Sequence, residues 1–343
     1  MLRSDAQIKR VLAVTLTGFL ALAGCSNSAA KDASGSAASP QASQAVESTD
    51  MAGMQHGSAH KININNAILS ELDKLEAKLG VLGLSNQIQA SRPYATVEEL
   101  VSKNVINQEQ FDQIKDLVTT EDIELTGEAK DVDYMVKLGL MKGHLMVAKE
   151  LLDLNQPKQA EPHIGHPVEE IYVDVEDQLN ERGVKEFKTT LINFQDLVKS
   201  KPSDPEVAQT YKSSMSAVDE AIQALPETQR QDPKFVLQVI NGLLDTANSE
   251  YTAAIADGKI AAAIEYQDSR GFVLYAQQLY KLIADPMSQN QPEAHKAIEA
   301  NLTSLIKAWP AAIAPATPVV SAADLTKQVK AIETQSAKVT ATP

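Results

Sequence analysis

The chain has 343 residues but only one cysteine, Cys25. A single thiol excludes an internal disulfide, so the fold depends on its core alone, whereas many exported proteins add cysteine pairs. Aromatic residues make up only 4% of the sequence, and no run of alternating β-branched residues is long enough to predict a sheet. With its many helix-forming residues, the sequence therefore favours an all-α protein.

Positive charge is also scarce, since 31 Lys and Arg stand against 45 Asp and Glu and give a formal charge of −14. An acidic surface repels the phosphates of nucleic acids and of anionic lipids, so nucleic acid is not the expected partner. Catalytic signals are missing as well. The sequence has no nucleophile with a fitting base, no phosphate loop and no strand–turn–helix for a catalytic serine. We therefore expect no enzymatic activity.

The N-terminus has the three parts of an export signal. The first ten residues are basic, and residues 11–22 form an uninterrupted run of apolar and small side chains. That run is too short to span a bilayer, which takes about 20 apolar residues. Residues 1–24 are therefore predicted to be a signal peptide that directs the chain out of the cytoplasm, to the periplasm or cell envelope.

The end of this signal resembles the lipobox of bacterial lipoproteins, in the residues Leu22-Ala23-Gly24-Cys25. The resemblance implies that Cys25 receives a diacylglycerol, that the signal is cut before it, and that the new amino group is acylated, for example with palmitate. Several acyl chains hold a protein to a membrane more firmly than one. The expected partner is thus membrane lipid, on the non-cytoplasmic side of the cell membrane or the outer membrane.

The rest of the chain divides by composition. Residues 25–60 are rich in Ser, Ala, Gln and Asp and predict a flexible, lipidated tether. From residue 61 onward apolar residues recur at spacings of three and four, which indicates amphipathic helices. We predict a small N-terminal module over 61–120, an antiparallel helical bundle over 131–309, and a Pro/Ala linker with a C-terminal helix over 310–343. The sequence leaves open whether that last helix packs on the bundle.

Helix boundaries follow from capping residues and prolines, as at Asp204-Pro205 and Asp232-Pro233. The helices of the bundle and the C-terminus are predicted near 131–154, 167–181, 184–199, 205–225, 233–255, 259–284, 292–308 and 321–337.

Residues 62–118 resemble the tandem helix-hairpin-helix unit of the DNA-uptake protein family ComEA and of the extrinsic photosystem II protein PsbU. The matching residues are Ile62-Asn63-Ile64-Asn65, Ala67, Glu71-Leu72, Arg92-Pro93-Tyr94, Thr96, Glu98-Glu99-Leu100 and Ile114. The resemblance implies a small module of paired helices at the start of an otherwise bundle-like chain.

The same resemblance does not carry the DNA-binding residues. DNA-binding members hold a Gly-hydrophobic-Gly turn in each hairpin, where glycine lets backbone amides face a phosphate. Here Gly80 and Gly83 stand at a different spacing, and the second turn, 103–107, has no glycine. Acids also outnumber bases in this segment, whereas DNA-binding modules usually carry a basic stripe. We therefore expect the module to serve packing or protein contact, and we assign no DNA-binding residue.

Histidine and methionine cluster in the tether. The four residues are Met51, Met54, His56 and His60. Thioether and imidazole together suit copper, and imidazole also accepts zinc. The tether is interpreted either as a soft, exchangeable string of metal ligands or as an incidental polar linker.

A second cluster surrounds a predicted turn at 155–157. His144 lies eleven residues before Asn155 and His166 eleven after it, so both fall at about one level of a helical hairpin. Histidines and carboxylates that converge inside a helical bundle form metal sites. The predicted ligands of a copper, iron or zinc ion are His144, His163, His166, Glu169 and Glu170.

This cluster also has a purely structural interpretation. Glu169 and Glu170 fit the first turn of a helix that starts at Pro167, where carboxylates satisfy free amides, and His144 fits a helix core. A later hairpin places Asp268 and Arg270 where the first places its histidines. Acids facing histidines would complete a metal site, but we expect these two residues to pair with each other.

The function predicted from the sequence is that of a membrane-anchored extracytoplasmic lipoprotein that binds or handles a transition metal through His, Met and Glu ligands. One alternative is a non-catalytic scaffold that binds a protein partner at the envelope. A second is an extracytoplasmic protein for DNA binding or uptake.

Overall fold

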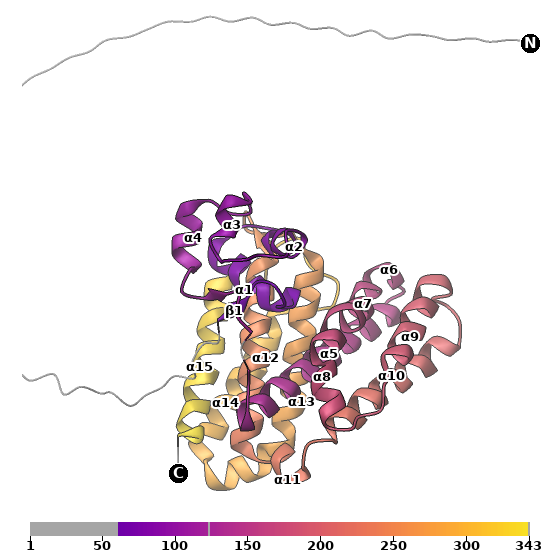
Figure 1. Ribbon diagram of the computed structural model, residues 1–343. Coiled ribbons are helices and arrows are strands. Elements are labelled where there is room, and N and C mark those ends of the chain that lie inside the picture. The colour runs from indigo at the N-terminus through magenta and orange to yellow at the C-terminus, as the bar shows by residue number, and fades with distance from the viewer. Residues whose placement is uncertain (1–60, 123, 342–343) are drawn as a thin grey trace, which may run out of the picture. The chain divides into compact units, whose positions relative to one another are not determined.

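The computed structural model describes residues 61–122 and 124–341, and helices dominate this part of the chain (Figure 1). Its strands are two pairs of two residues. β1 (Ile62–Asn63) runs parallel to β2 (Val118–Thr119), and β3 (Ile255–Ala256) runs antiparallel to β4 (Lys259–Ile260). The predicted features outside the described ranges are the signal peptide, the lipidation site and the tether ligands: 1–24, Cys25, Met51, Met54, His56 and His60.

The first four helices form a small N-terminal module. They are α1 (Leu69–Leu79), α2 (Leu84–Ala90), α3 (Glu99–Ser102) and α4 (Gln108–Ile114). Gly80 and Gly83, between α1 and α2, are left-handed at φ 64° and 75°, which glycine adopts without strain. After α3 Asn104 takes a left-handed φ of 57° in place of a glycine. The module has an apolar core of its own, which includes Leu72, Leu75, Leu84, Ile88 and Phe111.

The next segment is a long helix and a broken return arm. The elements are α5 (Gly127–Asp153), α6 (Pro157–Ala160), α7 (Pro162–His166), a π-helical turn (Pro167–Ile171) and α8 (Tyr172–Glu181). Asn155 turns the chain with a φ of 54°. Proline stands first in each of the three pieces that follow, where its missing N–H is tolerated, so the return arm consists of short helical pieces.

Two further helices, α9 (Lys188–Ser200) and α10 (Glu206–Ile222), pack on each other, and α10 also packs on α5. The apolar stripe predicted here is buried, since Leu191 and Phe194 have no exposed surface and Val198 almost none. A single turn of helix, α11 (Glu227–Arg230), leads into the C-terminal part.

The C-terminal part is a four-helix bundle (Figure 1). Its helices are α12 (Pro233–Ala253), α13 (Ala263–Asn290), α14 (Pro292–Leu305) and α15 (Ala322–Thr340). α12 packs on α13, α13 on α14, α14 on α15, and α15 on α12, which closes the ring. The last helix therefore docks on the bundle, with Leu325, Val329 and Ile332 buried. α13 continues through Pro286 to Asn290, beyond the predicted end at 284.

α5 lies against α12 and α13, and it meets α13 at a pair of glycines. A Cβ atom on Gly271 would lie 2.2 Å from the carbonyl oxygen of Gly143, and one on Gly143 would lie 2.9 Å from the carbonyl carbon of Gly271. The two backbones thus touch with no side chain between them. This contact brings His144, next to Gly143, close to Asp268, one turn before Gly271.

Across residues 61–122 and 124–341, no helix is both long enough and apolar enough to cross a membrane.

Candidate metal centre

Three helices bring the predicted histidines to a single carboxylate. His144 comes from α5, His163 and His166 come from α7, and Asp268 comes from α13. The Nδ1 atoms of His144 and His163 each lie 2.6 Å from Oδ1 of Asp268, and Nδ1 of His166 lies 3.6 Å from its Oδ2. His144, His163 and Asp268 are buried, and only His166 is partly exposed. His144 and His166, which their spacing placed at one level of a helical hairpin, lie side by side, with ring centroids 5.3 Å apart.

Both ring nitrogens of His163 have partners. Nδ1 bonds to Asp268 Oδ1, and Nε2 lies 2.8 Å from Oε1 of Gln267. The amide nitrogen of Gln267 donates in turn to Oε1 of Gln159 at 2.8 Å. Both ring nitrogens of His163 are therefore engaged with neighbouring oxygens. His163 therefore orients the Asp268 carboxylate, and neither of its nitrogens is free for a metal ion.

His144 is the opposite case. Its Nδ1 lies 2.6 Å from Asp268 Oδ1, close enough for the two groups to act on each other's charge but poorly directed for a hydrogen bond, and the residue is 1% exposed. The ring of Phe272 packs edge-on against it, with the centroids 5.0 Å apart. A buried nitrogen without a partner lowers stability by roughly 1–3 kcal/mol. The contact with Asp268 offsets part of this cost, and a cation bound by both side chains would require them to move slightly apart.

His166 supplies the third group. Its ring packs edge-on against that of His144, with centroids 5.3 Å apart, and its side chain is 28% exposed. Potential ligand atoms of His144, His166 and Asp268 lie within 4.8 Å of one another. Tetrahedral ligands at about 2.0–2.2 Å from one ion are about 3.3–3.6 Å apart, so these atoms are close to the required spacing but not at it. A small adjustment of side chains would let all three bind a single ion.

Charge at the centre is set by burial and by the close contacts. Burial opposes ionisation of Asp268, but His144 and His163 against it hold the pKa of its carboxyl well below the ordinary range. Burial lowers the pKa of the His144 imidazole. Burial also acts to lower the pKa of His166, but Asp268, Glu170 and Glu265 outweigh it and raise the pKa to about 9. These shifts favour the charged forms of Asp268 and His166 and the neutral form of His144.

More carboxylates surround this core. Burial raises the pKa of Glu250 on α12 well above its ordinary range, and that of Glu265 on α13 is raised as well. Asp73 on α1 shares the hydroxyl of Ser85 with Glu76, and burial raises the pKa of Asp73 to about 8. Because several acids act on one another in a buried region, a bound cation would be favoured there.

The two predicted glutamates lie differently. Glu170 is half-buried, and its Oε2 accepts a hydrogen bond from the backbone N–H of Leu69 at 3.0 Å. Glu169 is exposed. Only Glu170 lies beside the histidines, where it acts on the charge of His166.

The expected ion pair between Asp268 and Arg270 is wrong. Arg270 instead binds both carboxylate oxygens of Glu150, at 2.7 and 2.8 Å, and donates to the carbonyl of Trp309 at 2.8 Å. The reason lies in helix geometry, because residues two apart point to nearly opposite sides of a helix. That rule, applied to the sequence, would have separated the two side chains. Nothing in the sequence singled out Gln159 or Gln267.

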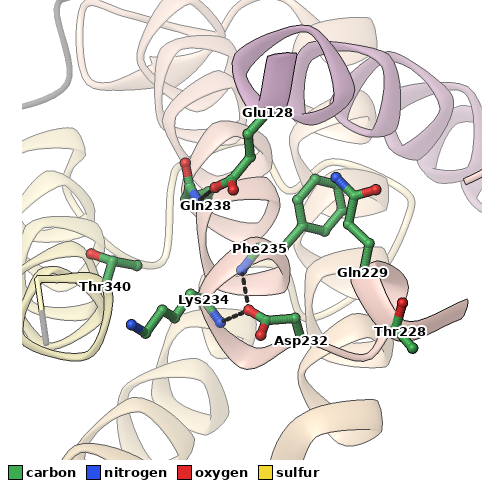
Figure 2. A pocket seen from close by; sticks show the side chains of 8 residues that line it. All are labelled: Glu128, Thr228, Gln229, Asp232, Lys234, Phe235, Gln238 and Thr340. Atoms are coloured by element: carbon green, nitrogen blue, oxygen red, sulfur yellow. Dashed lines mark hydrogen bonds between the residues drawn. The ribbon is translucent and has the colours of Figure 1, made fainter. Parts of the chain in front are cut away.

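A hollow in the described surface lies away from the histidines. Figure 2 shows its lining residues, which are Glu128, Thr228, Gln229, Asp232, Lys234, Phe235, Gln238 and Thr340. Asp232 accepts hydrogen bonds there from the backbone N–H groups of Lys234 and Phe235, at 2.8 and 3.0 Å. These bonds cap the start of α12. No histidine lines this hollow.

One comparison with known proteins gives a match. Residues 226–343 match a family model described as the iron permease-associated 4-helix bundle domain. The matched segment contains α12 to α15 and Asp268, but it contains none of the three histidines of the centre. No curated protein matches the chain, and no solved structure matches it.

Proposed function

We propose that this protein binds a first-row transition metal ion, iron(II) foremost, with His144, His166 and Asp268 as ligands. The observation that supports this most directly is the convergence of His144, His166 and Asp268, with the buried Nδ1 of His144 lying 2.6 Å from the Asp268 carboxylate in a poor direction for a hydrogen bond. Two imidazoles and one carboxylate are the donor set of many iron(II) sites, and zinc and copper also accept it. His163 acts as the outer partner that orients Asp268.

The choice of iron draws on the family match. The matched domain is described as iron permease-associated, which supports a role in iron or metal transport for this chain. The partial exposure of His166 supports the same role, because a transported ion must enter and leave. We therefore propose a metal-handling protein that holds its ion as cargo.

The proposal extends to the N-terminal part of the chain. A lipid on Cys25 would hold the protein at the outer side of a membrane, and the Met and His residues of the tether would collect metal near it. The module over 61–120 would be a degenerate helix-hairpin-helix unit that serves packing. Its four short helices and separate core support this reading, and its acidic character argues against DNA capture.

Calorimetric titration under anaerobic conditions with Fe²⁺, Zn²⁺ and Cu⁺ tests the centre. The full-length protein is used, with the tether ligands Met51, Met54, His56 and His60 replaced by Ala to remove their contribution. We expect about one ion per chain, and we expect its loss in His144→Ala and in Asp268→Asn.

His295→Ala is the matched control, because His295 lies on α14 and bonds to Tyr280 instead. It should bind metal as the parent does. If the parent binds no metal, or if His144→Ala binds as tightly as His295→Ala, the proposed centre is wrong. If metal binds to the protein with its tether ligands intact but not to the protein in which they are replaced, the tether alone holds the metal.

A further inference from the structure

Glu170 joins the metal centre to the N-terminal module. It lies in the π-helical turn that directly follows His166, and such turns often occur at functional sites. Residues four apart lie on the same side of a helix, so Glu170 and His166 are neighbours. The Oε2 of Glu170 nevertheless binds the N–H of Leu69, the first residue of α1, at 3.0 Å. The Glu170 carboxylate therefore binds α1 and also lies next to a proposed metal ligand.

The start of α1 depends on this bond. The residue that precedes the helix, Ile68, makes no side-chain cap. The first N–H groups of any helix lack partners within the helix, and a carboxylate is their favoured ligand. Glu170 thus replaces a capping residue that α1 itself does not have.

The remainder of α1 is held to the bundle by other contacts. Ile68 is 4% exposed and belongs to the core of the bundle. Lys74 pairs with Asp245 on α12 at 2.8 Å, and the partly exposed Glu71 lies near Lys137 on α5. If Glu170 turned away, α1 would remain attached, and only its first turn would loosen.

Charged groups act on Glu170 from both the N-terminal module and the bundle. On the module side, the guanidinium of Arg92 acts on Glu170 and is anchored to the carbonyls of Ile64 and Ala67, at 2.8 Å to Ile64. On the bundle side, His166 attracts the carboxylate, while Asp268 and Glu169 repel it. A metal ion on His166 would add positive charge on the bundle side alone.

An ion bound only by His144, His166 and Asp268 would have open coordination positions. Because Glu170 is half-buried beside His166, it is the predicted carboxylate best placed to fill one of them. To bind the ion, Glu170 must either break the hydrogen bond between its Oε2 and the N–H of Leu69 or contact the ion and that N–H at the same time.

We infer that Glu170 is a shared group: it caps α1 in the metal-free protein and turns to the ion when metal binds. The first turn of α1 then loosens, so the N-terminal module responds to the occupancy of the centre. This inference rests on the proposed function, because it needs an ion at His144, His166 and Asp268.

Leu69→Pro tests the sharing directly. Proline is tolerated at the first position of a helix and removes only the N–H there. Ile68 already has the extended backbone, φ −69° and ψ 164°, that a following proline requires. Leu69→Ala is the matched control, since it removes the same side chain but keeps the N–H. Both are titrated with Zn²⁺, which has no redox chemistry, in full-length protein without the tether ligands.

We expect Leu69→Pro to bind Zn²⁺ about tenfold more tightly than Leu69→Ala, because the hydrogen bond to the carboxylate no longer competes. Adding Glu170→Gln to both variants should weaken binding and abolish the difference between them. Equal affinities of the two single variants would overturn the inference while leaving the proposed function intact. If the parent protein fails to bind metal, the proposed function falls, and the inference falls with it.

Hydrogen exchange of the α1 amides gives a second readout that does not depend on proline. In the parent protein, Zn²⁺ should speed exchange in the first turn of α1, Leu69 to Leu72, and leave α12 unchanged or slower. In Glu170→Gln, Zn²⁺ should have no effect on that turn. Unchanged exchange in a parent protein that binds Zn²⁺ would overturn the sharing of Glu170.

Discussion

His144 and His163 touch the same oxygen of Asp268, but they play different parts. Each nitrogen of His163 makes a hydrogen bond, whereas Nδ1 of His144 contacts Asp268 in a poor direction for one. Exposure does not separate them, because both rings are buried. The hydrogen bonds do separate them. His163, with an acceptor at each nitrogen, positions the carboxylate, whereas His144, whose Nδ1 makes no well-directed hydrogen bond, can bind an ion.

This difference predicts unequal effects of substitution. His144→Ala removes a ligand and should abolish tight binding of Fe²⁺ or Zn²⁺. His163→Ala removes the group that orients Asp268, and changes of this kind lower metal affinity by about 10–100-fold. Titration calorimetry measures both. Equal loss in the two variants would show that His163 is itself a ligand.

Asp73 should make the stability of the protein depend on pH. Burial raises the pKa of its carboxyl from an ordinary 3.8 to about 8. Between these values the folded protein keeps a proton that the unfolded chain has lost, so the free energy of unfolding falls as the pH rises. Asp73→Asn cannot ionise. It should match the parent near pH 4 and be more stable by roughly 5 kcal/mol near pH 8, because the parent loses about 1.4 kcal/mol for each pH unit between the two pKa values.

Urea unfolding at several pH values between 4 and 8 measures this effect. Asp116→Asn, at an exposed position on the same module, serves as the control and should follow the parent at every pH. Parallel curves for Asp73→Asn and the parent would show that Asp73 does not carry the proton.

Residue-level prediction from the sequence succeeded where spacing alone decides. The equal distances of His144 and His166 from the turn at Asn155 were enough to predict that they meet. Asp268 was assigned to the wrong partner, because the contact between α5 and α13 determines which side of α13 faces the histidines. That contact joins residues more than a hundred positions apart, and no local pattern encodes it.

At the scale of elements, the crossing of α5 and α13 depends on Gly143 and Gly271. Their backbones touch, and a Cβ on either would meet backbone atoms of the other helix. Helix backbones cannot yield as a flexible side chain can. The crossing therefore sets how closely His144 can approach Asp268.

Gly271→Ala should separate these helices and weaken the fold by about 1–3 kcal/mol, as overpacking of a core does. It should also weaken metal binding, because His144 and Asp268 lie beside the crossing. Gly139→Ala is the comparison, because Gly139 lies on α5 one turn before Gly143. Its Cβ would meet the side chains of Leu243 and Tyr275 at 3.0 and 3.1 Å, and these side chains can adjust.

Urea unfolding and metal titration of the two variants decide the matter. Both substitutions gain the same helix propensity, so their difference reports the crossing alone. If Gly139→Ala were the more damaging change, the role given to the glycine contact would be wrong.

Helices were the elements that the sequence predicted best. Apolar spacing located α9, α10 and α12 to α15, and Asp232 with Pro233 marked the start of α12. The two small strand pairs were not predicted, because two residues are too few to show an alternating pattern. The predicted extent of the helix near 259–284 was shifted, since Lys259 and Ile260 form β4 and α13 begins only at Ala263.

At the scale of the whole molecule, the centre joins the matched four-helix bundle to the segment that precedes it. Only Asp268 lies in the bundle, and the histidines come from α5 and α7. Any ion bound there crosslinks the two parts. Sequence reasoning predicted a bundle and a separate module, but it could not predict that α1 packs on α12, because that contact is between surfaces far apart in the chain.

Metal should therefore stabilise the entire fold. An ion at about 100 times its Kd adds roughly 2.7 kcal/mol, which should raise the melting temperature by about 5 °C or more. Thermal unfolding followed by circular dichroism, with Zn²⁺ or with a chelator, measures the shift. His144→Ala should show none, and a shift of equal size in that variant would place the stabilising ion elsewhere.

The separation of His163 and Asp268 along the chain also determines the order in which the groups of the centre are synthesised. The two residues are 105 positions apart, and ribosomes add about 5–20 residues each second. All three histidines are thus synthesised roughly 5 to 20 s before the acid that unites them. During that interval the nascent polypeptide has imidazoles but no complete centre, so selective capture of an ion must wait until α13 has been made and has docked against α5.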